Sequence, residues 1–158
     1  MLTLWRIGSD TPDYAADDLA GVGAERSGGR WNRKGTRMVY ASTSRALACL
    51  ETLAHLGSGD LPLNRYLAAV TLTSDDWVAR TVFDSATHVG WDAEPPGLVS
   101  LDWGNRWSTG RSSLLAEVPS VIVPEESNVL INPLHPAATT LVSRKIRRWA
   151  YDARLRSV

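Results

Sequence analysis

Apolar and polar residues alternate at the start of the chain, over residues 2–7. A period of two is typical of a strand with different environments on its two faces. The alternation predicts a strand with Trp5 and Ile7 on one face and Leu4 and Arg6 on the other. Short runs rich in apolar and β-branched residues predict further strands at 38–41, 66–72 and 128–131.

The clearest helical pattern follows the hydroxyl residues at 42–44, which can cap a helix N-terminus. The glycines at 57 and 59 and Pro62 predict its end. The apolar positions that recur at helical spacing are Ala46, Leu47, Leu50, Leu53 and Ala54.

The remaining segments give weaker patterns. The glycine-rich basic stretch 21–35 predicts a loop, 74–97 is loop-rich with one possible turn of structure, 101–109 predicts a helix, and 139–151 mixes strand-like residues with a basic cluster. Pro119 interrupts the apolar run 114–123, which indicates a bulge or an edge position and would re-aim Ser120. Short strands around a few helices predict an α+β fold with a small bent sheet, as one domain over residues 1–158.

Composition narrows the class of protein. Seventeen basic residues balance seventeen acidic ones, so no global field favours nucleic acid or a membrane surface. The single cysteine, Cys49, cannot form an internal disulfide, which suits a reducing compartment. There is no signal peptide pattern and no run of about eighteen apolar residues. We therefore expect a cytoplasmic protein with no membrane association.

The segment from Ser27 to Asn32 places two glycines directly before Arg30 and Trp31. Glycines let the backbone approach a ligand closely, and a guanidinium can bind two phosphate oxygens at once. The alternative is a solvated basic turn, since other basic residues lie nearby. Neither a P-loop nor Gly-x-Gly-x-x-Gly is present, which argues against the familiar nucleotide-binding folds.

Glu51 lies at the edge of the apolar stripe of the predicted helix, one turn after Leu47 and one turn before His55. A partly desolvated carboxylate there can stabilise a developing cation. The alternative is an exposed i,i+4 pair with His55. Two ligands without a third do not make a metal site, and nothing near Cys49 would activate it as a nucleophile.

Several short motifs, in order and spacing over nearly the whole chain, resemble the RES domain family, which is named for an arginine, a glutamate and a serine. They are Leu4-Trp-Arg6, Gly29-Arg30-Trp31-Asn32, Gly35 with Val39-Tyr40-Ala-Ser42, Leu47-Ala-Cys-Leu-Glu51-Thr-Leu-Ala-His55, Val118-Pro-Ser120-Val-Ile-Val-Pro124 and Asn128-Val-Leu-Ile-Asn132-Pro-Leu-His135-Pro136. Residues 81–97 match no part of the pattern.

The resemblance implies an ADP-ribosyltransferase-like fold whose cleft takes NAD⁺ as a consumed substrate, with no cofactor and no metal. It implies that Glu51 stabilises the ribose cation, Arg30 holds the pyrophosphate or adjoining ribose, and Tyr40 walls in the nicotinamide. Ser120 would bind ribose or position the acceptor. The predicted catalytic residues are thus Glu51, Arg30, Tyr40 and Ser120, and the predicted NAD⁺ contacts are Arg6, Arg30, Trp31, Tyr40 and Asn128.

The acceptor stays open at this stage. Water or phosphate would make the chain an NAD⁺ glycohydrolase or phosphorylase, whereas a protein side chain would make it an ADP-ribosyltransferase. The resemblance also implies a toxin of a type II toxin–antitoxin system, as a homodimer within a hetero-oligomer. Its partner would be a helix-turn-helix (Xre-type) antitoxin, with DNA reached only through that partner.

Two alternative functions from other classes of protein have to be considered. The basic stretches 26–37 and 144–148, with Trp31 and Trp149 available to stack on bases, would suit a nucleic-acid-binding module. Zero net charge and the lack of a binding motif argue against it. A structural partner with a decayed site is disfavoured by the intact predicted set.

Overall fold

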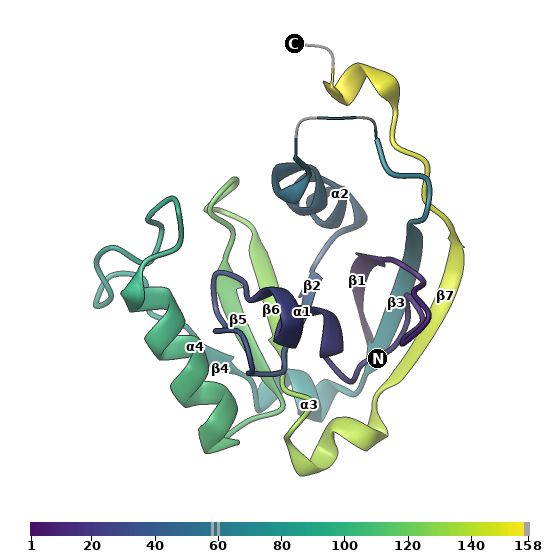
Figure 1. Ribbon diagram of the computed structural model, residues 1–158. Helices are drawn as coiled ribbons and strands as arrows, with labels where there is room; N and C mark the ends of the chain where they lie inside the picture. Colours follow the sequence, from purple (N-terminus) through teal and green to yellow (C-terminus); the bar gives the residue numbers. More distant parts are fainter. Residues whose placement is uncertain (58, 60, 157–158) are drawn as a thin grey trace.

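The computed structural model describes residues 1–57, 59 and 61–156, and it is organised around one seven-stranded sheet (Figure 1). The strand order is β4-β5-β6-β2-β1-β3-β7, and every neighbouring pair is antiparallel except β4 and β5. The predicted α+β class is confirmed. The strands are β1 (Leu2–Gly8), β2 (Val39–Ser42), β3 (Tyr66–Leu72), β4 (Thr81–Val82), β5 (Leu115–Pro119), β6 (Ser127–Ile131) and β7 (Val142–Arg148).

The helices are short and irregularly spaced. They are α1 (Val22–Ser27), α2 (Arg45–His55), α3 (Ser74–Val78) and α4 (Leu98–Gly110), with 3₁₀ turns η1 (Pro136–Thr140) and η2 (Ala153–Arg156). None of the described helices is long and apolar enough to cross a membrane.

The two faces of the sheet carry separate apolar clusters. Leu4 belongs to the cluster on one face, whereas Trp5 and Ile7 pack in a different cluster, as the alternation in β1 predicts. The cluster around Leu4 has more buried aliphatic residues than the cluster around Ile7. Trp77 of α3 and the alanines of η1 pack against it. Its buried members are Leu4, Val39, Ala41, Val70, Leu72, Leu114, Leu115, Val129 and Ile131.

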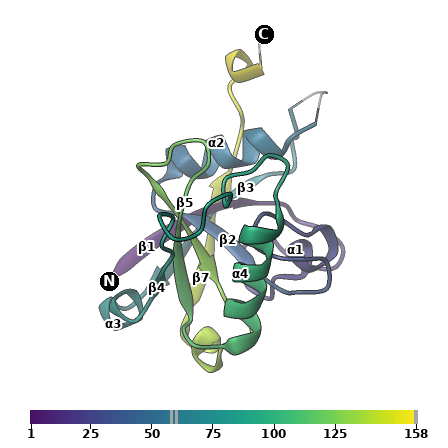
Figure 2. The ribbon, with the colours of Figure 1, turned by 90° about the vertical axis from the view of Figure 1, so that its left-hand side faces the viewer.

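Helices α2 and α4 cover different parts of the structure, α2 near β1 and β3 and α4 near β5 (Figures 1 and 2). Ala48 of α2 packs with Ile7 and Leu67. Trp107 of α4 packs with residues of β5 and β6 and with the segment that includes Trp31. The side chains of β2 and β6 between these two packed regions therefore border an open space.

Helix α2 begins where the hydroxyl pattern predicts, because the Ser44 side chain accepts a hydrogen bond from Leu47 N at 3.1 Å. Its inner face is narrower than predicted: Leu47 and Ala48 are buried, but Leu50 is exposed. Ala46 and Ala54 are exposed as well. Position 51, one turn after Leu47, consequently lies on the inward side of the helix.

Three sequence predictions need correction. The stretch 21–35 contains α1, and the segment 74–97 contains α3, whose Thr73 and Asp76 form a capping box, as well as β4. Weak helical periodicity in these short segments explains why the pattern missed them. The helix predicted at 101–109 is confirmed as α4, which begins three residues earlier.

Pro119 is the last residue of β5 and makes no bulge in it, which corrects that part of the third prediction. Strand β4 pairs only with residues 116 and 117 of β5, so Pro119 lies at an edge of the sheet, as the other alternative predicts. Pro119 pairs with Ser127 at the end of the antiparallel β5–β6 ladder. The chain then turns, and Ser120 N donates a hydrogen bond to Glu126 O at 2.9 Å. Ser120 is thereby held at the tip of the β5–β6 hairpin, which is close to α2.

Gly104 controls how closely α4 approaches the rest of the fold. A Cβ at this position would lie 1.9 Å from the Trp31 carbonyl oxygen and 2.7 Å from its carbonyl carbon. Both atoms are backbone, so the clash cannot be relieved by a side-chain rotation. Gly104 therefore sets the position of the segment that carries Arg30.

We predict that Gly104→Ala lowers the free energy of unfolding by at least about 2 kcal/mol in urea denaturation, because the added methyl group must displace packed backbone. Gly110→Ala in the same helix is the control, since a Cβ there has no atom within 4 Å. It should leave the stability unchanged or raise it by up to about 1 kcal/mol. Equal effects of the two substitutions would contradict the packing argument.

Candidate functional site

A cavity of about 880 Å³ lies beside α2 and the ends of β1, β2 and β6. This volume is in the range of small-molecule sites. The segments 21–31 and 38–42, together with residues of α2 and of the loop before α4, form its wall. Among the predicted site residues, those that line it are Arg6, Arg30, Trp31, Tyr40, Glu51 and Asn128.

The Glu51 carboxylate is fixed by two donors from the sheet side of the cavity. Its Oε1 accepts hydrogen bonds from Ser120 Oγ at 2.7 Å and from Asn128 Nδ2 at 2.6 Å. Asn128 is itself oriented, because its Oδ1 accepts from Ser42 Oγ at 2.7 Å and the two residues face each other in the β2–β6 register. Within the described residues, no donor contacts Glu51 Oε2. One carboxylate oxygen is thus anchored and the other is available at the cavity wall.

Ser120 is fully buried and does not line the cavity. Its hydroxyl donates to Glu51 and accepts from the backbone N–H groups of Ile122 and Val123, both at 3.1 Å. The hairpin turn thereby fixes the direction in which the hydroxyl hydrogen points. Ser120 therefore holds the Glu51 carboxylate by a hydrogen bond from the protein interior and not from the cavity.

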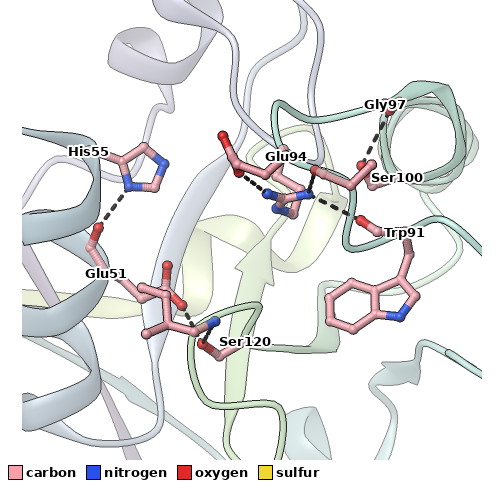
Figure 3. A network of polar contacts seen from close by, with 10 residues as sticks. Glu51, His55, Trp91, Glu94, Gly97, Ser100 and Ser120 are labelled. Carbon is pink, nitrogen blue, oxygen red and sulfur yellow. Dashed lines mark hydrogen bonds and ion pairs between the residues drawn. The ribbon is translucent and has the colours of Figure 1, made fainter.

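His55 does not pair with the Glu51 carboxylate, which corrects the alternative drawn from the sequence. Its Nδ1 lies 2.7 Å from the backbone carbonyl oxygen of Glu51. Figure 3 shows the Glu51 side chain turned toward Ser120 while the His55 ring contacts the helix backbone. The carboxylate is consequently free of a neighbouring cation on its own helix.

Tyr40 holds the glycine-rich segment by its hydroxyl. Tyr40 Oη accepts from Trp31 N at 3.0 Å and donates to Asn32 Oδ1 at 2.7 Å. A Cβ on Gly29 would lie 2.6 Å from the same hydroxyl, which explains the need for glycine there. Burial raises the pKa of Tyr40 well above the usual range of a phenol, so the hydroxyl stays neutral.

Arg30 is neither solvated nor exposed. Only 13% of its side chain is accessible, and its guanidinium donates to Trp91 O at 3.2 Å and Ala93 O at 2.6 Å. It also forms an ion pair with Glu94 at 2.6 Å. The basic-turn alternative therefore does not describe this arginine, which lies in the cavity wall and is bound by residues 91–94, a segment that matches none of the family motifs.

The ring of Trp31 is packed in the core. Its indole is 3% exposed and lies in an aromatic cluster with Phe83, Trp91 and Trp103, at centroid distances of 4.8, 6.2 and 5.5 Å. No open face is left to stack on a base or a nicotinamide. The cluster instead fixes the backbone directly after Arg30.

Arg6 supplies a second guanidinium to the cavity wall. Its Nη1 donates to Asp18 O at 3.0 Å, whereas its buried Nε has no partner in the described part of the chain. Burial lowers the pKa of Arg6, an effect that Asp18 partly offsets. Arginine nevertheless stays protonated at neutral pH, so a partly buried, incompletely paired cation borders the cavity.

Sequence reasoning missed two residues of this site. Ser42 orients Asn128, and the β2–β6 pairing that brings them together cannot be seen in one strand alone. Glu94 reaches Arg30 from 64 positions away, in a loop without any motif. In the described residues, no group of three or more His, Cys, Asp or Glu side chains could hold a metal ion. Burial raises the pKa of the Cys49 thiol, which does not favour a nucleophile.

Comparison with known proteins places this geometry in a family. The RES domain model matches residues 3–153. A protein of Sphingobium sp. (strain YBL2) named Prs ADP-ribosylating toxin is 51% identical over 154 residues, 97% of this chain and 96% of its own. Toxin Res of Pseudomonas putida is 38% identical over 156 residues, 98% of this chain and 99% of its own.

A solved structure has the same fold at low sequence identity. One chain of the M. tuberculosis MbcT–MbcA toxin–antitoxin complex matches with a TM-score of 0.55 and 16% identity, over 92% of this chain and 84% of that chain. The family model and both sequence relatives cover nearly the whole chain, so the assignment does not depend on one motif. This chain therefore belongs to the RES domain family.

Proposed function

We propose that the chain is a toxin-type enzyme that cleaves the bond between nicotinamide and ribose in NAD⁺. The observation that carries the proposal is the Glu51 carboxylate at the cavity wall, anchored through one oxygen by Ser120 and Asn128. Cleavage of this bond leaves an oxocarbenium-like ribose, and a preorganised anion is the natural stabiliser of that cation. NAD⁺ is the consumed substrate, and the proposed reaction needs no metal and no cofactor.

The proposed reaction breaks one bond and forms one, because the acceptor, which is water, phosphate or a protein side chain, bonds to ribose C1′ and gives any proton that it loses to solvent. The bond between ribose C1′ and the pyridinium nitrogen breaks, its electron pair stays on nitrogen, and nicotinamide leaves as a neutral molecule. Because the leaving group needs no proton, Glu51 acts by charge, with Oε2 as the free oxygen. Ser120, whose buried hydroxyl points at Oε1, is a positioning residue in this scheme. Asn128 acts in the same way while also lining the cavity.

The rest of the cavity wall suits the other parts of NAD⁺. Arg6 and Arg30 line it together with Arg65, and two guanidinium groups match the two negative charges of a pyrophosphate. The Tyr40 ring lines the cavity next to Arg30 and can wall in the nicotinamide. Trp31 contributes through the backbone that it fixes, since its ring is packed in the core.

The acceptor and the partners belong to the same proposal. Water would give a glycohydrolase and phosphate a phosphorylase. The name of the Sphingobium relative favours the ADP-ribosyltransferase alternative, in which a protein side chain attacks C1′. We propose a cytoplasmic toxin restrained by an Xre-type antitoxin, as a homodimer within a hetero-oligomer that reaches DNA only through the antitoxin. The toxin–antitoxin title of the structural neighbour supports a partner of this kind.

The arginines of the basic stretch 26–37 argue against the nucleic-acid-binding alternative. Each forms an ion pair with a carboxylate, and these pairs are Arg26–Asp13, Arg30–Glu94, Arg33–Asp102 and Arg37–Glu25. A guanidinium that is already paired must give up its carboxylate before it binds a nucleic acid phosphate, which reduces the electrostatic gain of each contact. The buried ring of Trp31 removes the stacking residue of this stretch.

We predict that the purified wild-type chain releases nicotinamide from NAD⁺ and that Glu51→Gln reduces kcat by about 10²-fold or more. The substitution keeps the size of the side chain and removes its charge. Assays with and without phosphate, and with cell extract, identify the acceptor. Glu125→Gln, an exposed position after the Ser120 turn, is the charge control and should retain wild-type rates. An inactive wild type under all three conditions would refute the proposed function.

We predict that Tyr40→Phe lowers the free energy of unfolding by about 1–3 kcal/mol, because Trp31 N and Asn32 Oδ1 each lose a buried partner. Because the ring remains, the variant should keep measurable NAD⁺ cleavage. Tyr66→Phe is the control, since the Tyr66 hydroxyl has no hydrogen bond among the described residues. Equal stability of the two variants in urea denaturation would show that the Tyr40 hydroxyl does not hold the segment.

We predict that replacing Arg147 and Arg148 together by alanine leaves nicotinamide release unchanged. Both are exposed on the edge strand β7, and neither lines the cavity. Anisotropy titrations of the wild type with duplex DNA should show no salt-dependent binding by the isolated chain. Tight binding that weakens steeply with salt and is lost in the double variant would favour the nucleic-acid alternative.

A further inference from the structure

The Arg30 guanidinium, which the proposed function assigns to an anionic part of the substrate, is already bound by the chain itself. Three of the hydrogen bonds that it can donate go to residues 91–94: two from Nη1 to the carbonyl oxygens of Trp91 and Ala93, and one from Nη2 to the Glu94 carboxylate. Glu94 lines the cavity together with Arg30. An internal anion therefore contacts the cation at the place where the substrate's anion is expected.

The three contacts differ in how firmly the protein holds them. Trp91 is 9% exposed and packs against Trp31 and Phe83. The Glu94 side chain is 74% exposed, and its only hydrogen bond among the described residues is the one to Arg30. Figure 3 shows Glu94 across the site from Glu51 and Ser120, with Trp91 beside it. The backbone contacts of Arg30 are thus anchored by an aromatic cluster, whereas the carboxylate can rotate into solvent.

We propose that the Glu94 carboxylate occupies the position on Arg30 that a phosphate group of the substrate takes, and that it must leave Arg30 when the substrate binds. The proposal rests on the proposed function for the identity of the substrate as NAD⁺, but the competition itself concerns any phosphate-bearing ligand of this cavity. Glu94 thereby sets the affinity for substrate without taking part in bond cleavage.

Charge explains why both anions cannot stay. A carboxylate and a phosphate on one guanidinium would be within a few ångströms of each other, which costs free energy at a partly desolvated site. Loss of the mostly exposed ion pair costs little in comparison. Because Trp91 and Ala93 keep Arg30 oriented after Glu94 leaves, the guanidinium stays preorganised for the incoming anion.

The proposal is tested with Glu94→Gln in the full chain, using inorganic pyrophosphate as a binding probe in calorimetry and NAD⁺ as substrate in kinetics. We expect pyrophosphate to bind roughly twofold to fivefold tighter to the variant than to the wild type, the range expected for a mostly exposed ion pair. KM for NAD⁺ should fall by a similar factor while kcat changes by less than about twofold.

Asp92→Asn is the matched control, because Asp92 is an exposed carboxylate of the same loop with no contact to Arg30. It removes the same charge and should leave pyrophosphate affinity and KM at the wild-type values. An equal gain in pyrophosphate affinity in both variants would show that the effect comes only from the lower net negative charge of the loop, and it would overturn the proposal. Unchanged or weaker binding of pyrophosphate by Glu94→Gln, or no binding by either protein, would overturn it as well.

The two proposals fail separately in this experiment. If NAD⁺ is cleaved but Glu94→Gln changes neither KM nor pyrophosphate affinity, the role of Glu94 is refuted and the proposed function stands. If pyrophosphate binds tighter to Glu94→Gln but neither protein cleaves NAD⁺, the competition at Arg30 stands and the proposed reaction is refuted.

Discussion

The cost of a carboxylate in a partly buried position is the constraint on which the site depends. Glu51 faces inward from α2, where water cannot fully solvate it, and an unpaired charge there would be strongly unfavourable. The hydrogen bonds from Ser120 and Asn128 compensate one oxygen. These donors come from the β5–β6 hairpin, so the pairing of β2, β6 and β5 and the docking of α2 must all be in register for Glu51 to be tolerated. The same contacts that make the charge acceptable also fix its direction.

Local patterns predicted most of the elements that carry these residues. The alternation in β1, the strand at 66–72 and the Ser44 cap of α2 are confirmed, because each depends on residues close together in the chain. The short helices α1 and α3 and the end of β5 at Pro119 were not predicted. In these segments a few residues are stabilised by contacts with distant parts of the fold, and no periodicity records such contacts.

The site residues likewise fall into those that the sequence predicts and those that it does not. Glu51 could be singled out because its helix has a recognisable inner face, and Arg30 because two glycines precede it. Family resemblance supplied the roles of Tyr40 and Ser120, and nothing in the sequence indicated that Ser120 is buried behind Glu51. Glu94 could not be predicted from the sequence, because it pairs with a residue 64 positions away and lies in a loop that carries no motif.

The proposed function requires that the cavity bind NAD⁺ with its nicotinamide ribose at Glu51. A crystal structure of the Glu51→Gln variant with NAD⁺ tests this directly, because the substitution is expected to leave the substrate intact. We predict that the nicotinamide ribose lies against residue 51, with the pyrophosphate near Arg6 and Arg30. NAD⁺ bound with its nicotinamide ribose away from residue 51, or a cavity that stays empty at NAD⁺ concentrations that saturate the wild-type enzyme, would refute the proposed role of Glu51.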